Sequence, residues 1–233
     1  MKGLRHGKGI EYYKNGTIKY DGDFVNDKYE GKGEFKYPNG EYYIGHFLNG
    51  LKHGKGKEYY KNGTIKYDGD FVKDKYEGKG EFIYSNDETY KGQFLKGLRH
   101  GKGKEYYKNK SIKYDGDFFK NKYEGYGKYY LKNGEYYFGH FLNGLKHGKG
   151  IQYYKNKSIK YEGNFVKNKY QGNGKKVYEN GEYYSGPFLN GLRHGKGKEY
   201  YKNDTIKYDG DFVNDKYEGN GEFKYSNGEY YIG

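Results

Sequence analysis

The sequence contains no cysteine and no tryptophan, and its 233 residues include only two prolines and one methionine. Without cysteine, disulfide bonds and thiolate metal sites are excluded, and a reducing compartment is compatible with the chain. No stretch of 18 consecutive apolar residues occurs, and residues 1–13 hold no apolar core of a signal peptide. We therefore expect a cytoplasmic protein, with a peripheral position at a membrane or the cytoskeleton as the alternative.

Hydrophobic residues are also scarce, at 33% of the chain, which excludes a thick aliphatic core. Aromatic residues nevertheless make up 21%, and the sequence has 36 tyrosines and 41 glycines. Because disordered chains are poor in aromatic residues, this composition indicates a folded protein. The net charge of +13 favours acidic partners, but Asp and Glu alternate with Lys throughout. We therefore expect the positive charge to be spread thinly, at about one charge per repeat.

The chain is built from repeats. The motif Gly-Leu-Lys/Arg-His-Gly-Lys-Gly begins at Gly50 and recurs every 47 residues, and a shorter motif, Tyr-x-Gly-x-Phe, divides each interval into copies of 23 and 24 residues. Such a fixed period indicates a repeat architecture. A partial copy covers residues 1–19 and a stub covers 231–233, so we predict a single array over 1–233. Complete copies begin at Tyr20, Tyr43, Tyr67, Tyr90, Tyr114, Tyr137, Tyr161, Tyr184 and Tyr208.

Each copy predicts a β-hairpin. In residues 67–72 and 79–84, aromatic residues or glycine alternate with mostly charged residues, which is the period of a β-strand. We expect residues 73–78 and 50–56 to be loops. Asn-Gly pairs predict tight turns between copies, and the turns that lack this glycine, at Asn109, Asn156 and Asn203, are expected to be looser.

Two local irregularities are predicted as well. The extra residue of each 24-residue copy indicates a bulge or a longer loop after the turn. Pro187 lies inside a predicted strand, where it removes a ladder hydrogen bond or marks an unpaired position. The fold class is therefore an all-β, single-layer antiparallel meander of hairpins that are stable only when stacked on their neighbours.

The motifs Tyr-x-Gly-x-Phe and Asn-Gly-Leu-Lys-His-Gly-Lys-Gly resemble the MORN repeat family over essentially the whole chain. The resemblance implies an elongated, twisted sheet that acts as a scaffold. Members of the family are associated with acidic phospholipids, with cytoskeletal assemblies, with homodimerisation, and as accessory modules of larger enzymes, but they share no enzymatic activity. The 24-residue copies resemble a variant form, in which an aromatic residue is replaced by Glu11, Glu58, Glu105, Gln152 and Glu199. Lys176 interrupts the aromatic pattern of the 23-residue copies.

The sequence predicts no enzyme, no cofactor, no metal and no small-molecule substrate. The recurring histidines lie four strands apart, roughly 19 Å, so they do not share a metal ion. Every carboxylate recurs with the repeat, so none is singled out as a catalytic acid or base. Carboxylates between the basic residues argue against nucleic acid as a partner. A module truncated from a larger enzyme is a minor alternative, and a carbohydrate-binding repeat is another, which the absence of tryptophan disfavours.

Two surfaces are candidates for binding. A basic loop edge would attract acidic phospholipids, and an aromatic face would bind other proteins or a second copy of the chain. The simpler explanations are that the charges only solubilise the sheet and that neighbouring rings and glycines bury one another. The basic edge comprises Arg5, Lys8, Lys52, Lys55, Arg99, Lys102, Lys146, Lys149, Arg193 and Lys196. The aromatic face comprises Tyr43, Phe47, Tyr67, Phe71, Phe82, Tyr84, Tyr114, Phe118, Tyr161, Phe165, Tyr208 and Phe212.

Overall fold

A computed structural model describes residues 3–233, and every regular element in that range is a β-strand. The chain divides into two compact units, unit 1 ending at Asn121 and unit 2 beginning at Lys122. The strands of unit 1 are β1 (Gly7–Tyr12), β2 (Ile18–Val25), β3 (Lys28–Lys36), β4 (Tyr42–Leu48), β5 (Leu51–Tyr59), β6 (Ile65–Val72), β7 (Lys75–Ile83), β8 (Thr89–Leu95), β9 (Leu98–Tyr106) and β10 (Ile112–Phe119). The strands of unit 2 are β11 (Lys122–Tyr130), β12 (Tyr136–Leu142), β13 (Leu145–Tyr153), β14 (Ile159–Val166), β15 (Lys169–Val177), β16 (Tyr183–Leu189), β17 (Leu192–Arg193), β18 (Gly195–Tyr200), β19 (Ile206–Val213), β20 (Lys216–Lys224) and β21 (Tyr230–Ile232).

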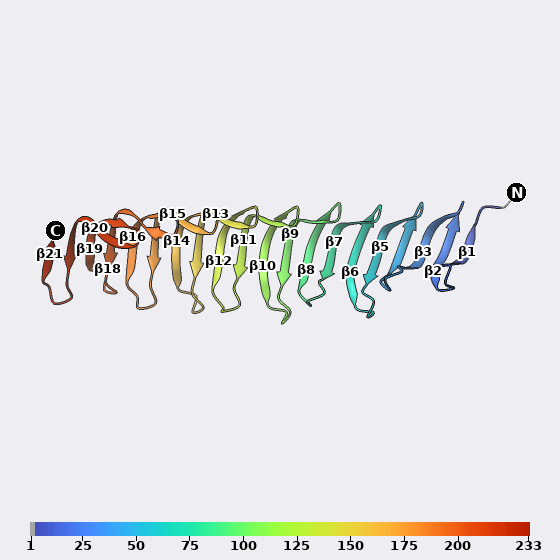
Figure 1. The fold of residues 1–233 in the computed structure, drawn as a ribbon, viewed down its shortest axis with the longest axis horizontal. Coiled ribbons are helices and arrows are strands. Elements are labelled where there is room, and N and C mark those ends of the chain that lie inside the picture. The colour runs from blue at the N-terminus through green and yellow to red at the C-terminus, as the bar shows by residue number, and fades with distance from the viewer. Residues whose placement is uncertain (1–2) are drawn as a thin grey trace. The chain divides into compact units, whose positions relative to one another are not determined.

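Strands that are neighbours in the sequence pair antiparallel within each unit (Figure 1). In unit 2 the same order holds, except that β16 pairs with both β17 and β18. The predicted all-β antiparallel hairpin meander is therefore confirmed. That both units belong to one array stays a prediction.

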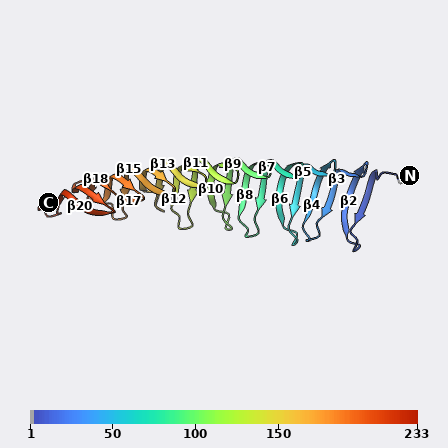
Figure 2. The same ribbon diagram turned by 45° about the horizontal axis from the view of Figure 1, so that its top comes forward.

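The hairpin turns at one edge of the sheet contain only two residues, as the connections in Figure 2 illustrate. Asn49 and Gly50 join β4 to β5 with φ angles of 53° and 84°, and Lys73 and Asp74 join β6 to β7 with φ angles of 49° and 65°. Positive φ at both positions is typical of the tight turns that match strand twist. The prediction of longer loops at 50–56 and 73–78 was wrong, because these residues continue almost entirely as strand.

Part of the predicted loop is instead a bulge. Gly45 pairs with Gly56 and Phe47 pairs with Lys52, so three residues of β5 face the single residue His46 of β4. Gly54 lies within this bulge with a φ of +66°, a conformation that side chains with a Cβ rarely adopt. The extra residues bend the strand and turn the side chain of Lys52 toward the aromatic side of the sheet.

The turns at the other edge are alike whether or not they contain glycine. The amide of Gly63 donates to the Tyr60 carbonyl at 2.9 Å, and the amide of Lys110 donates to the Tyr107 carbonyl at the same distance. The Asn62 side chain stabilises its turn by accepting from the Thr64 amide at 3.0 Å. The prediction of looser turns without glycine was therefore wrong.

Both predicted irregularities are present. The register shifts between Glu58 and Tyr59 opposite β6, which confirms the bulge in the 24-residue copies. Opposite Pro187 the ladder is interrupted at His194, between β17 and β18, whereas β13 runs unbroken at the same place. Proline has no amide hydrogen to donate to a ladder, so this break has a direct chemical cause.

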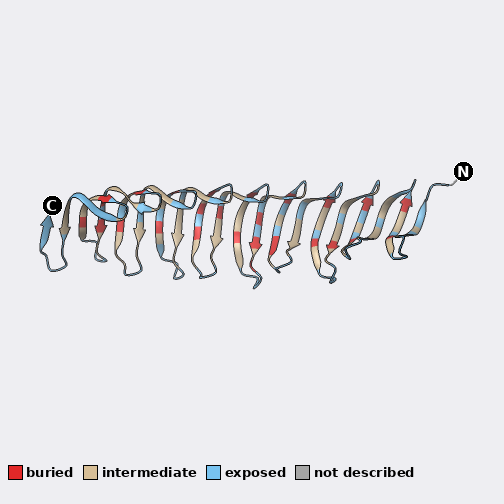
Figure 3. Cartoon of the chain, in the orientation of Figure 1, coloured by how far each residue is buried: buried red, intermediate tan, exposed pale blue. Residues whose placement is uncertain are grey.

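The core is a line of aromatic rings, and Figure 3 shows the buried positions recurring along the strands. Tyr67 is fully buried, its ring stacks on Tyr76 with centroids 3.9 Å apart, and it meets Phe71 edge to face at 5.1 Å. Its hydroxyl donates to the Asp70 carbonyl at 3.1 Å. Rings packed in this way bury a large apolar area while each hydroxyl keeps a hydrogen-bond partner.

Candidate functional site

The aromatic side of the sheet carries a charged cluster in three of the four complete 24-residue copies. In unit 1, Glu58 is buried and binds both the Lys52 ammonium and the Tyr76 hydroxyl. Burial opposes the charge of Lys52, but the Glu58 carboxylate prevails and raises the pKa of Lys52. A buried carboxylate is tolerated only when such partners are present.

The same cluster recurs with arginine in other copies. Arg99 Nη1 lies 3.0 Å from Glu105, Arg193 Nη1 lies 3.0 Å from Glu199, and Glu105 and Glu199 are only 6% and 7% exposed. In the partial copy at residues 1–19, Arg5 Nη1 lies 2.7 Å from Glu11. These glutamates are therefore structural partners of the basic residues.

The predicted basic edge divides into two groups. Arg5, Lys52, Arg99 and Arg193 bind carboxylates on the aromatic side, and Lys52 keeps only 12% of its side chain exposed. Lys55 and Lys102, by contrast, are 89% and 76% exposed. The ten residues thus do not form a single exposed row, because the bulge separates the first basic residue of each copy from the second. Binding of acidic lipids by this edge stays a prediction.

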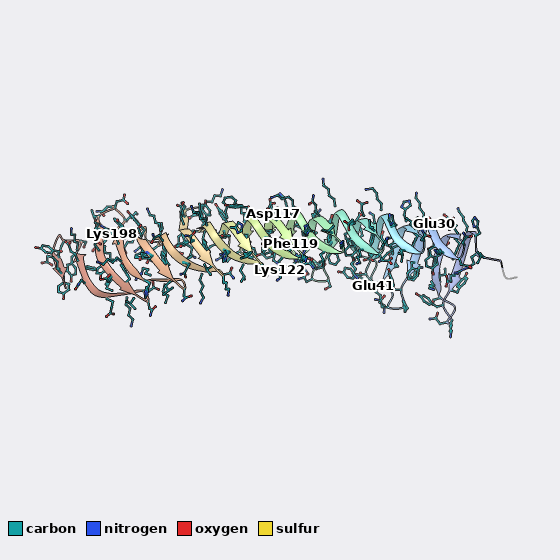
Figure 4. The ribbon with its side chains drawn as sticks, turned by 90° about the horizontal axis from the view of Figure 1, so that it is seen from above. Glu30, Glu41, Asp117, Phe119, Lys122 and Lys198 are labelled. Atoms are coloured by element: carbon teal, nitrogen blue, oxygen red, sulfur yellow. The ribbon has the colours of Figure 1, made fainter. Side chains whose placement is uncertain are left out.

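Charged pairs also run across the strands on the other side of the sheet. Lys102 lies 2.7 Å from Asp117, and Lys57 lies 2.8 Å from Asp68. On the aromatic side, the lysine that forms the extra residue of the β6 bulge binds a glutamate beside a turn: Lys66 lies 3.0 Å from Glu41, which is labelled in Figure 4. Several outward lysines of unit 1 are therefore offset by carboxylates.

The predicted aromatic interaction face is largely inaccessible. Ten of its twelve residues are at most 5% exposed, and only Phe82 and Tyr84 are intermediate. The rings are covered by one another and by the glycines beneath them. The prediction that this face is free for a partner was wrong, and the alternative, in which rings and glycines bury one another, is correct.

Each unit has a different exposed apolar surface, which we call its tip ridge. It consists of the aliphatic and aromatic residues flanking the two-residue turns, each between 37% and 48% exposed. Phe119, labelled in Figure 4, is the largest of them. The sequence signal was the apolar residue before each turn, joined in alternate turns by a second one after it, as in Leu-Asn-Gly-Leu. The ridge comprises Val25, Leu48, Leu51, Val72, Leu95, Leu98 and Phe119 in unit 1, and Leu142, Leu145, Val166, Leu189, Leu192 and Val213 in unit 2.

Unit 2 also has a shallow hollow of about 390 Å³ on the side opposite the core, lined by Tyr126, Phe138 and Ile151 beside Asn164 and Asn173. Tyr126 and Phe138 are 61% and 48% exposed. The corresponding residues of unit 1 include Lys32, Ile44 and Lys57. This apolar patch is therefore a local departure from the charged pattern.

Comparison with known proteins accounts for the repeat. The MORN repeat model matches ten consecutive segments, and nine of them begin where the Tyr-x-Gly-x-Phe period places a complete copy. The chain belongs to the MORN repeat family. The matched segments are residues 1–18, 20–42, 43–65, 67–89, 90–112, 114–136, 137–159, 161–183, 184–206 and 208–230.

MORN repeats commonly serve as scaffolds for interactions with proteins or membranes, and the family is not enzymatic. Among solved structures, the chain is similar to the SAS-4 (dCPAP) TCP domain of Drosophila melanogaster, solved in complex with a proline-rich motif of Ana2 (dSTIL). The identity is 14%, the match covers 86% of this chain and 88% of that one, and the TM-score is 0.30. A search of curated proteins gave no match.

The charged cluster of this MORN protein is altered around Lys146. Gln152 stands where the other copies have glutamate, and Leu131 replaces the tyrosine found at Tyr37 and Tyr84. Lys146, equivalent to Lys52, is thus left without a carboxylate of its own. Burial lowers the pKa of Lys146 to about 8, although Glu135 partly opposes this effect.

The net charge is concentrated in the middle of the sequence. Residues 98–181 contain 19 Lys and Arg residues against seven Asp and Glu residues, so they carry 12 of the 13 excess positive charges. The predicted excess of about one charge per repeat therefore holds only as an average, and the expectation that the charge is evenly spread was wrong. Within unit 2, residues 145–181 contain nine lysines and two glutamates.

Neither a metal site nor a membrane-spanning helix is present in residues 3–233. No group of three or more His, Asp or Glu residues in that range is placed to hold a metal ion. No helix there is long and apolar enough to cross a bilayer.

Proposed function

We propose that this MORN protein is a non-enzymatic scaffold that binds protein through its tip ridge, and that its first partner is a second copy of itself. The observation that carries the proposal is the exposure of apolar side chains at every two-residue turn, while the aromatic core is closed. Exposed apolar rows of this kind on a water-facing edge usually mark an interaction surface.

The spacing of the ridge favours a partner with the same period. Neighbouring hairpins lie roughly 10 Å apart, since each contributes two strands about 4.8 Å apart. A second copy has the same spacing, so its ridge residues meet those of the first in register along a unit. Charges beside the ridge are also self-complementary, because Asp27 and Asp74 alternate with Lys28 and Lys75.

Light scattering on purified protein at about 1–100 µM tests the proposal. We expect a dimer that persists in high salt, because apolar contacts are not screened. Replacing Leu48, Leu51, Leu95 and Leu98 with serine should give a monomer. The matched control, Ile44→Ser with Phe138→Ser, removes equally exposed apolar residues away from the turns and should leave the dimer intact. A monomeric wild type, or a tip variant that stays dimeric, contradicts the proposal.

A second candidate function is binding of acidic phospholipids by unit 2. It is favoured by the excess of lysine over glutamate in residues 145–181 and by Asn164, which replaces the aspartate that pairs with lysine in other copies. Lysines near an anionic surface contribute about 1 kcal/mol each.

Co-sedimentation with phosphoinositide-containing and neutral vesicles tests this second candidate. Binding should occur only to the acidic vesicles and should be lost at high salt. Changing Lys149, Lys167 and Lys175 to glutamate should abolish it, whereas changing Lys8, Lys55 and Lys79 in unit 1 should leave most of it. Equal binding to neutral vesicles, or no binding at low salt, overturns it.

A further inference from the structure

The cluster around Lys146 combines a half-buried lysine with the loss of the two groups, a glutamate and a tyrosine, that lie beside the equivalent Lys52. We propose that Lys146 is a covalent acylation site, whose amine takes an acyl group from a small activated acyl donor such as a thioester, an acyl phosphate or an active ester. The proposal is independent of the scaffold function, because it depends on one residue of the aromatic side.

The basic residues equivalent to Lys146 have carboxylate partners in the other copies. Lys52, Arg99 and Arg193 each lie against a glutamate that is less than 10% exposed. At Lys146 the corresponding side chain is the neutral Gln152, which lies within 3.5 Å of the Tyr170 hydroxyl. The amine therefore occupies the same half-buried place without the anion that holds it protonated in the other copies.

The groups around Lys146 do not replace that anion. Its Nζ lies 4.9 Å from the ring centre of Tyr137 and 5.9 Å from that of Phe165. The charge of Glu135 favours the ammonium of Lys146, but Glu135 binds Lys160 at 2.7 Å, and the charge of Lys160 disfavours a second ammonium. Lys52 lies over the ring of Tyr37, but the position equivalent to Tyr37 near Lys146 in the repeat is Leu131, which has no hydroxyl.

The consequence is a lysine that is neutral more often than an ordinary one. Burial lowers the pKa of Lys146 to about 8, so a substantial fraction of the amine is unprotonated at pH 7.5. For Lys52 the Glu58 carboxylate raises the pKa, and the amine stays protonated. Only the neutral amine is a nucleophile, so the two equivalent lysines should differ in reactivity.

The reaction is a simple acyl transfer. The lone pair of the neutral Nζ attacks the acyl carbonyl carbon and forms the C–N bond. The bond from this carbon to the leaving group then breaks, the leaving group departs with the electron pair as a thiolate, phosphate or alkoxide-type anion, and the surplus proton on nitrogen passes to water. No redox partner is needed.

Acylation also suits the environment of Lys146. The amide product is uncharged, so the modified side chain no longer places an ammonium against Tyr137 and Phe165. The same modification at Lys52 would leave Glu58 buried with only its tyrosine partner. Both the rate and the tolerance of the fold therefore favour Lys146.

The experiment measures acetylation by N-acetoxysuccinimide, added below the protein concentration at pH 7.5, with each lysine quantified by peptide mass spectrometry. We expect Lys146 to react roughly tenfold faster than Lys52 and faster than the exposed Lys149 on the same strand. Its rate should rise with pH and level off above about pH 8, whereas the rate at Lys149 should keep rising toward pH 10.

Two reciprocal variants test whether the missing glutamate causes the reactivity of Lys146. Gln152→Glu restores the residue present in the other copies and should lower the acetylation rate of Lys146 at least fivefold. Glu58→Gln should raise the acetylation rate of Lys52. Circular dichroism checks that both variants keep the sheet. The proposal is overturned if Lys146 reacts no faster than Lys149, or if a folded Gln152→Glu variant reacts at the wild-type rate.

Discussion

The ring of Tyr20 lies directly over Gly33, so closely that a Cβ at Gly33 would come within 2.5 Å of the Tyr20 hydroxyl oxygen. Gly22, which pairs with Gly33 across the two strands, meets the same ring at the same distance. The aromatic core thus rests on backbone, and glycine is required because any side chain would occupy the volume of the ring.

This contact predicts that Gly33→Ala is destabilising. The added methyl must push the buried Tyr20 ring off the sheet, which we expect to lower the free energy of unfolding by about 2–3 kcal/mol. Urea unfolding followed by circular dichroism measures the change. Gly3→Ala is the control, since a Cβ there meets nothing within 4 Å. Equal midpoints for the two variants would contradict the packing argument.

The turns predict a stabilising change. Lys157 adopts a φ of 70° at the position where other copies have glycine, such as Gly63 with a φ of 81°. A left-handed conformation costs a residue with a Cβ about 1 kcal/mol, and the greater freedom of glycine in the unfolded chain offsets part of the gain. Lys157→Gly should therefore raise the free energy of unfolding by about 0.5 kcal/mol, as measured by urea denaturation.

The reverse change serves as the check on the turn prediction. Gly63→Lys places a side chain at an equivalent turn and should lower the free energy of unfolding by a similar amount. If both substitutions shift stability in the same direction, the turn conformation is not the cause.

The repeat period and the strand alternation were sufficient to predict the hairpin meander, its copy boundaries, the bulge of the 24-residue copies and the break at Pro187. The features that these patterns did not predict depend on how the strands pair with one another. A loop and a bulged strand look alike in Gly50–Gly56, because the sequence does not say that Gly54 adopts a positive φ within a ladder. That bulge turns Lys52 inward, so the basic edge could not be placed from spacing alone.

The candidate site was less predictable than the fold for a related reason. Alternation shows which residues share a face, but not that the Tyr67 ring lies flat over the glycines and leaves the aromatic side closed. Gln152 was visible in the sequence as an exception to a series of glutamates. Its consequence for Lys146 became apparent only when the structure placed the two positions in one cluster.

The pair of equivalent lysines predicts opposite effects of the same substitution. Lys146→Met removes an ammonium that burial disfavours and should raise the free energy of unfolding by roughly 1–2 kcal/mol at pH 7. Lys52→Met leaves the buried Glu58 without its cation and should lower it by roughly 2–4 kcal/mol. Thermal or urea unfolding of the two variants measures both values.

The gain in the free energy of unfolding from Lys146→Met should also depend on pH. The pKa of Lys146 is lowered to about 8 in the folded protein, so between about pH 8 and 10.5 the unfolded chain binds a proton that the folded chain does not. Wild-type stability at this site therefore rises with pH over that range, and the gain from the methionine should shrink from its full value at pH 7 toward zero. A gain that is constant from pH 7 to 10 would contradict an unpaired lysine.

The buried tyrosines predict unfolding in alkali. Burial raises the pKa of Tyr20, Tyr170 and Tyr184 to about 12, and it raises that of Tyr43 and Tyr67 further. Below pH 10 the hydroxyls are neutral in both the folded and the unfolded chain, so their contribution to stability is complete. Above pH 10 the unfolded chain ionises while the core does not, and stability falls as pH rises toward 12.

We therefore expect tyrosinate absorbance at about 295 nm to rise between pH 10 and 12, and the circular dichroism signal of the strands to disappear over the same range. The hydroxyls of Tyr20, Tyr43, Tyr67 and Tyr184 each donate to a backbone carbonyl, as Tyr67 does to that of Asp70. Ionisation within the folded sheet would therefore remove a donor and bury an anion beside an acceptor. The ring stack thus requires neutral hydroxyls. Gradual ionisation near pH 10, with the strand signal intact at pH 12, would show that the rings are reached by water without opening the sheet.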